Sequence, residues 1–176
     1  MLRHELSDVY DAEHRFLEGQ QEILQEATAP DLRGAIENHI EQTRQQITNL
    51  EEVFAELGQE PRREACEAAQ GLVSEAREGI QETPTSTLRD CAIVSAVIKV
   101  EHYEMGSYRG VVTGARLMGQ TKIERLLAEN MHQEEETARI AESSAEELFG
   151  KTMQAEGEQP EQKGLVDKAK NKVTGQ

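Results

Sequence analysis

Apolar residues recur at spacings of three, four and seven along four long stretches of the sequence, and this pattern constrains the fold more than any other feature. Such spacing gathers apolar side chains on one face of an α-helix and does not suit a β-strand, in which alternate residues share a face. Aromatic residues make up only 3% of the chain and Trp is absent, which disfavours sheet sandwiches and barrels. The sequence therefore predicts an all-α protein with amphipathic helices over approximately residues 2–27, 28–57, 87–114 and 121–150.

Local motifs mark where these helices begin and end. Thr28 and Pro30 supply a capping hydroxyl and a proline suited to the first turn of the second helix. Gly150 is expected to end the last helix, since glycine commonly follows a helix C-terminus. Capping-box motifs, each a threonine followed three residues later by an acid, open the third and fourth long helices: Thr87 with Asp90, and Thr121 with Glu124.

Residues 58–86 interrupt the helical pattern with glycines and prolines around a short helical stretch. The turn before Pro30 is only a few residues long, so the first two long helices are predicted to be antiparallel neighbours. The chain thus forms one helical pair, then a longer crossover with a short fifth helix, then a second pair. This is the connectivity of a ferritin-like four-helix bundle. We therefore predict a ferritin-like bundle over residues 1–150 and a flexible polar tail over residues 151–176, where apolar residues are few.

The charge and the cysteines of the chain narrow its location and its partners. Nineteen Lys and Arg against 34 Asp and Glu give a net charge of −15, which repels nucleic-acid phosphates and anionic membrane surfaces. The sequence shows neither a membrane-spanning apolar run nor a secretory signal. Cys66 and Cys91 lie outside any CxxC motif, which favours plain thiols in a reducing compartment. We expect a cytoplasmic protein without a membrane or nucleic-acid partner.

Carboxylates interrupt the apolar faces of three of the long helices. On a helical wheel, Glu13, Glu101 and Glu134 lie in the middle of apolar faces, and each is near the middle of its helix. Glu104 lies one turn beyond Glu101 and about 60° to the side. The helix over residues 28–57 has no carboxylate on this face and offers other polar residues there: His39, Thr43 and Gln46, with Glu41 pointing away.

In an antiparallel bundle these mid-helix positions meet at one height. A buried and unpaired carboxylate costs several kcal/mol, and four together also repel one another. Two divalent cations would balance the charge of Glu13, Glu101, Glu104 and Glu134, and such ligands suit iron or manganese. The alternative is that core arginines or His39 bridge these carboxylates, or that the carboxylates are protonated with raised pKa values.

Four sequence strings, in matching order and spacing between Leu2 and Leu148, carry a resemblance to a known family: LSDVYDAEHRF, HIEQTRQQI, KVEHYEMGSY and LLAEN. The chain resembles the YciE/YciF family of ferritin-like bacterial stress proteins. The resemblance implies a five-helix ferritin-like fold, a homodimer and a metal site inside the bundle. The glutamate of the family's first helix falls on Glu13, its EHYE motif falls on residues 101–104, and its acidic last-helix segment falls on Glu134.

Other polar residues near the predicted core are weaker candidates. We assign His39 and Gln46 as outer or weak metal ligands. A standard ferritin-like site carries Glu-x-x-His motifs, whereas here Thr137 follows Glu134 at that spacing. The Glu-x-x-His string at residues 129–132 is predicted to face away from the core and to bind no metal.

Two functions stay open from the sequence. The first is a stress-response protein with a dimetal-carboxylate site for iron or manganese that oxidises bound Fe(II) with oxygen or peroxide. The second is a non-catalytic dimeric bundle that acts as a structural or partner-binding stress protein. Residues 164–175, GLVDKAKNKVTG, are similar to the short repeat of CsbD-like stress proteins, which leaves their role open.

Overall fold

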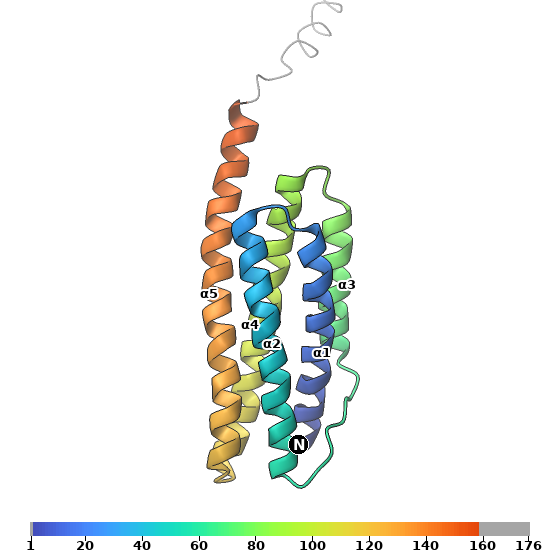
Figure 1. The fold of residues 1–176 in the computed structure, drawn as a ribbon, viewed down its shortest axis with the longest axis vertical. Coiled ribbons are helices and arrows are strands. Elements are labelled where there is room, and N and C mark those ends of the chain that lie inside the picture. The colour runs from blue at the N-terminus through green and yellow to red at the C-terminus, as the bar shows by residue number, and fades with distance from the viewer. Residues whose placement is uncertain (1, 159–176) are drawn as a thin grey trace, which may run out of the picture.

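The computed structural model describes residues 2–158, and within this range it contains five helices and no strand (Figure 1). The helices are α1 (Leu2–Glu26), α2 (Pro30–Glu56), α3 (Glu67–Gln81), α4 (Ser86–Leu117) and α5 (Thr121–Glu158). The four long helices are those that the apolar spacing predicts, and α3 is the short helix of the crossover. None of the helices in this range is both long enough and apolar enough to cross a membrane.

The helices pack as two antiparallel pairs, α1 with α2 and α4 with α5 (Figure 1). The crossover through α3 returns the chain to the end of the bundle at which α2 begins, so α2 and α4 run in the same direction. Within the bundle α1 also packs against α4, and α2 packs against α5, while α3 lies outside against α1 and α4. This arrangement confirms the predicted all-α ferritin-like bundle with a fifth helix in the crossover.

Two apolar clusters fill the bundle at different heights. One contains Leu6, Leu50 and Leu127, from the start of α1, the end of α2 and the start of α5. The other contains Ile36 and Ile93, from the start of α2 and the start of α4. The buried polar residues of the middle turns lie between these clusters, which keep water away from them.

The start of α2 is capped from another helix. The carboxylate of Asp90 in α4 accepts hydrogen bonds from the backbone N–H groups of Thr28 and Ala29, at 2.8 and 2.9 Å, and from the Thr28 hydroxyl at 2.6 Å. The predicted capping box of Thr87 with Asp90 is therefore wrong. Thr85 caps α4 instead, by accepting from the backbone N–H of Leu88. Asp90 is buried, and it satisfies the backbone donors of the turn between α1 and α2.

The last helix runs through Gly150 to Glu158, so the predicted helix end at Gly150 is wrong. A glycine inside a helix costs only about 1 kcal/mol relative to alanine, and packing beyond it outweighs that cost. Thr152 is buried, and its hydroxyl lies 3.5 Å from the Cys91 thiol of α4. The helix thus crosses the expected boundary between bundle and tail at residue 150. Residues 164–175, for which the sequence indicates a similarity to CsbD-like proteins, lie outside the described residues, so this similarity stays a prediction.

The connection between α2 and α3 is fixed to α1 by one buried carboxylate. Asp11 accepts hydrogen bonds from the backbone N–H of Cys66 at 2.8 Å, from Arg63 at 2.7 Å and from Arg15 at 2.5 Å. Burial acts to raise the pKa of Asp11, but these three donors outweigh it and hold the pKa below its usual value. Cys66 caps α3 and is buried, and burial raises the pKa of its thiol, as expected for an unreactive cysteine.

Candidate metal centre

Four of the predicted site residues meet in the middle of the bundle: His39 from α2, Glu101 and Glu104 from α4, and Glu134 from α5. Each offers one ligand atom, and these atoms all lie within 4.8 Å of one another. All four side chains are buried, with exposed fractions of 4%, 1%, 3% and 0%. The geometry therefore gathers a nitrogen and three carboxylates around one point, as a divalent metal ion requires.

His39 is closer to this group than the sequence suggests. Its Nε2 atom lies 3.0 Å from Glu101 Oε1, and both side chains are buried. The wheel places His39 at the edge of the apolar face of α2, but the long imidazole side chain reaches inward from that edge. His39 therefore joins the central group, whereas the sequence assigns it as an outer or weak ligand.

Glu13 and Gln46 lie beside the central group and interact with it. Glu13 of α1 is fully buried and accepts a hydrogen bond from the Tyr108 hydroxyl. Gln46 of α2 is also fully buried, and its amide donates to Glu134 Oε1. Four of the six predicted residues thus form the central group, Gln46 bonds to one of them, and Glu13 is close enough for its charge to act on Glu101 and Glu104.

Several ligand-type atoms of this centre make no hydrogen bond in the protein. These are Glu13 Oε2, Glu101 Oε2, Glu134 Oε2 and also His39 Nε2, which lies 3.0 Å from Glu101 Oε1 without the geometry of a hydrogen bond. An unsatisfied buried polar group costs about 1–3 kcal/mol, so four at one place call for an explanation. A metal ion bound to these atoms would satisfy them together, and hence the residues present fit such an ion.

The carboxylates of the centre hold their protons more tightly than usual. Burial raises the pKa of Glu101 to about 7. Burial, and then the charge of neighbouring carboxylates, raises the pKa values of Glu13, Glu104 and Glu134 well above the usual range. Without a cation these groups cannot all be ionised near neutral pH.

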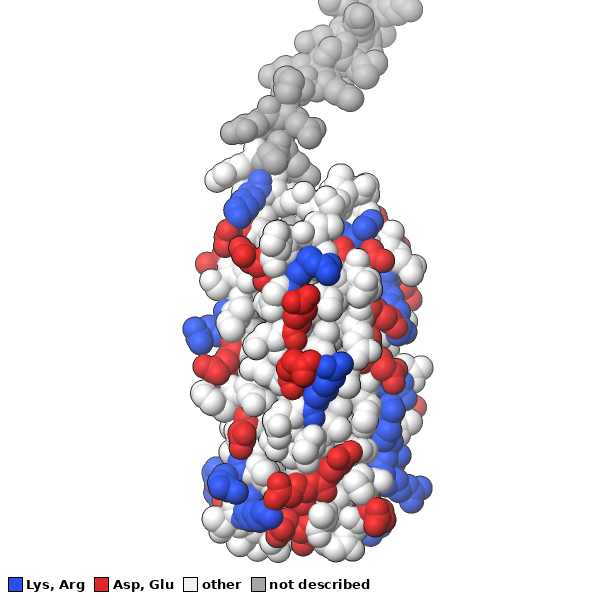
Figure 2. All heavy atoms as spheres, viewed as in Figure 1, with Lys and Arg blue, Asp and Glu red and all other residues white. Residues whose placement is uncertain are grey.

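Basic side chains do not neutralise the centre. Among residues 2–158 no Lys or Arg is buried, and many of these residues form ion pairs, such as Arg77 with Glu22, Lys99 with Glu75 and Lys122 with Glu56. Figure 2 shows Lys and Arg side chains at the surface of one face, beside Asp and Glu. The alternative in which core arginines bridge the carboxylates is therefore excluded for this part of the chain. His39, protons and a bound cation are the remaining ways to balance the charge.

A hydrogen-bonded network next to the centre was not predicted from the sequence. Asn130 donates to the backbone oxygen of Gln46 at 3.1 Å and to the Tyr108 hydroxyl at 3.0 Å, and it accepts from Asn49 at 2.7 Å. Asn130 precedes Glu134 by one helical turn, so its spacing on the wheel could have revealed it. On the other side of the centre Gln20 donates to Thr43 at 3.0 Å.

The residues predicted to lie outside the core do so. Glu41 is exposed and pairs with Arg44 on the surface of α2. Glu129 and His132, the ends of the Glu-x-x-His string, are both exposed. His102 is exposed as well and lies 3.0 Å from Glu142. These positions confirm the assignment of helix faces.

Comparison with known proteins gives a family and a fold. The family described as a domain of unknown function, DUF892, matches residues 1–154. Protein YciF of Escherichia coli is 35% identical over 135 residues, which cover 76% of this chain and 81% of that protein.

Solved structures agree with this relationship. The crystal structure of the E. coli stress protein YciF superposes with a TM-score of 0.81 at 32% identity, covering 85% of this chain and 95% of that chain. YcfI of Rhodopseudomonas palustris, for which a structural role has been suggested, superposes with a TM-score of 0.79 at 35% identity, covering 80% and 90%. A protein of Xanthomonas campestris at 21% identity, with a TM-score of 0.70, shares the fold. The chain therefore belongs to the DUF892 family, the family of the E. coli stress protein YciF.

Proposed function

We propose that this protein binds iron or manganese in the middle of its bundle as part of a stress response. His39, Glu101, Glu104 and Glu134 would hold one ion, and Glu13, with the free oxygens of its neighbours, would hold a second. The observation that supports this most is the set of buried ligand atoms that make no hydrogen bond in the protein. The lack of any buried Lys or Arg among residues 2–158 adds to it, because only a cation would let these carboxylates ionise together.

A pair of Fe(II) ions bound there would supply two electrons and become Fe(III). With two protons, these electrons would reduce dioxygen to hydrogen peroxide, or hydrogen peroxide to two molecules of water. The chain's own residues would position the ligands. Tyr108 holds one oxygen of Glu13, and Gln46 holds one oxygen of Glu134, so that in each carboxylate the other oxygen makes no hydrogen bond and is available as a ligand. The apolar clusters above and below exclude water.

A non-catalytic role is the second candidate, and the raised pKa values favour it. Protonated carboxyl groups would carry no charge, and Tyr108 and Gln46 already satisfy part of the network. In that case the chain would be a dimeric structural or partner-binding protein of the stress response. The homodimer itself is a proposal from the family resemblance under either function.

Metal content and melting temperature separate the two candidates. We expect the full chain, purified without chelator, to carry iron or manganese, and EDTA to lower its melting temperature. A ligand at a hundredfold excess over its Kd stabilises the fold by about 2.7 kcal/mol, so the shift should be several degrees. An unchanged melting curve in EDTA, Fe(II) and Mn(II) would contradict metal binding and favour the structural role.

The substitution Glu101→Gln tests the ligand set. It keeps the shape of the side chain but removes a charge and a ligand oxygen, so Fe(II) stoichiometry should fall while the protein stays folded. The matched control is Glu41→Gln, because Glu41 is exposed on the opposite face of α2 and should alter neither property. Equal effects from the two substitutions would contradict the assignment of the site to the bundle core.

A further inference from the structure

An apolar cavity of about 50 Å³ lies between α1, α3 and α4 and extends outward from the metal centre. Its walls are apolar side chains of these three helices, among them Phe16, Val73, Val97 and Val100. Small residues, Gly19 of α1 among them, leave the space that these side chains do not fill. A cavity with such walls stays free of ordered water and accepts small apolar molecules.

The inner end of this cavity is the metal centre itself. His39 and Glu101 line it, and they are the pair of central residues whose atoms lie 3.0 Å apart. Gln20 lines the same end, with its Oε1 atom buried and unpaired. Polar atoms therefore lie at the inner end, and apolar walls connect that end to the outside of the bundle.

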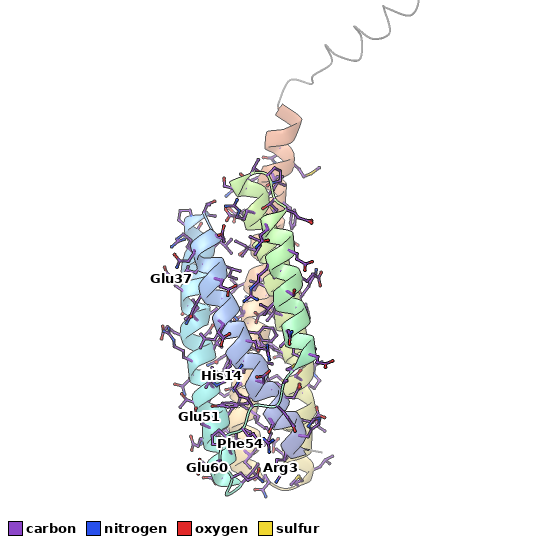
Figure 3. All side chains as sticks on the ribbon, turned by 90° about the vertical axis from the view of Figure 1, so that its right-hand side faces the viewer. Arg3, His14, Glu37, Glu51, Phe54 and Glu60 are labelled. Atoms are coloured by element: carbon purple, nitrogen blue, oxygen red, sulfur yellow. The ribbon has the colours of Figure 1, made fainter. Side chains whose placement is uncertain are left out.

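The outer end lies under α3, which Figure 3 shows beside α1. Glu22 of α1 and Arg77 of α3 line this end and join across it through two hydrogen bonds of 2.6 and 2.7 Å. Both residues are half-exposed, at 50% and 51%, so the pair is at the surface. The cavity therefore runs from an exposed ion pair inward to His39 and Glu101.

We propose that this cavity is the route and holding site by which dioxygen reaches the centre, an inference that rests on the proposed function. Dioxygen is small, apolar and uncharged, and it needs no hydrogen bond along the walls. Peroxide and water need several polar partners, which the apolar walls between the two ends of the cavity do not provide. The oxidant for which this protein is built is therefore dioxygen rather than peroxide.

A second hollow, of about 30 Å³, adjoins the first and lies between α1, α2, α4 and α5. It contains His39 but none of the site carboxylates. It reaches only one member of the centre, and we do not assign it as the route.

Xenon provides a direct probe of the cavity, because it is an apolar atom that occupies voids of this size. A crystal of the full chain pressurised with xenon is expected to show one atom against Phe16 and Val97. Xenon occupancy does not depend on metal. Its absence from this cavity in a protein that binds iron would overturn this inference and leave the proposed function standing. Absence of bound iron would be seen before oxygen is added and would overturn the proposed function.

The variant Gly19→Leu tests the route in solution. A Cβ at Gly19 would lie 3.5 Å from Val73 Cγ2, an ordinary contact, and the rest of the leucine would occupy the cavity. We expect it to lose xenon and to slow the oxidation of bound Fe(II) by dioxygen about tenfold, with Fe(II) stoichiometry unchanged. The matched control is Gly34→Leu, the same change at a helical position with open space around it. Oxidation as fast as in the unaltered protein, or slowed equally by Gly34→Leu, would overturn the proposal.

Discussion

Tyr108 links the candidate centre to the polar network beside it. It is the largest fully buried side chain of the described residues, its hydroxyl donates to Glu13, and Asn130 donates to that hydroxyl at 3.0 Å. The surrounding carboxylates and its burial hold the phenol in its neutral, donating form, since burial first and then the charge of Glu13 raise its pKa. One hydroxyl thus orients a proposed ligand and satisfies a buried amide.

We predict that Tyr108→Phe lowers the free energy of unfolding by about 1–3 kcal/mol, because it leaves a buried oxygen of Glu13 without a partner and removes one of the two acceptors of the Asn130 amide. Urea unfolding at pH 7 measures this. Tyr10→Phe is the control: its hydroxyl donates to Glu51 at 3.0 Å in a partly buried position, where water can replace it. A loss for Tyr108→Phe no larger than that for Tyr10→Phe would show that the network adds little stability.

At the level of the helices, the connection that leads into α3 is fixed to α1 by hydrogen bonds. Asp11 binds the Cys66 backbone and two arginines, and the backbone N–H of Glu64 donates to the Ser7 carbonyl at 3.2 Å. These contacts fix the chain as it enters α3, and they thereby fix the outer wall of the apolar cavity.

We predict a pH-dependent cost for Asp11→Asn. The pKa of Asp11 in the folded protein lies below the ordinary value of 3.8, so its charge stabilises the fold above that pH, and this contribution is lost as the pH falls through the folded-state pKa. The variant should therefore lose about 1–2 kcal/mol at pH 7 and much less at pH 3. Chemical denaturation at both pH values checks this.

The control for Asp11→Asn is Glu22→Gln, which removes an exposed ion pair with Arg77. Exposed pairs contribute about 0–1 kcal/mol, so this loss should be smaller at pH 7. A cost for Asp11→Asn that is the same at pH 3 and pH 7 would mean that the shape of the side chain, and not its charge, fixes the connection.

The helices could be predicted from the sequence far better than their ends. Apolar spacing depends on which face of a helix is buried, and that information is local. The end of α5 depends on Thr152 packing against Cys91, and the cap of α2 depends on Asp90 of a distant helix. Contacts between helices therefore determine where α5 ends and how α2 is capped, and the spacing of residues within one helix does not predict such contacts.

Within the whole molecule, the centre lies where the four long helices meet between two apolar clusters. The wheel could predict Glu13, Glu101 and Glu134 because each lies in the middle of an apolar face, and all three are buried. It could not place His39 within reach of Glu101, since that depends on how closely α2 approaches α4. The sequence could not predict the cavity under α3 either, because side chains of three helices form it.

The central claim is that His39, Glu101, Glu104 and Glu134 bind a metal ion. Anomalous scattering at the iron absorption edge tests it most directly, on crystals of the full chain grown without chelator and soaked anaerobically in Fe(II). We predict the strongest peak in the map at the point within ligand distance of these four side chains. A map with no peak there, or with iron only on exposed surface carboxylates, would contradict the claim.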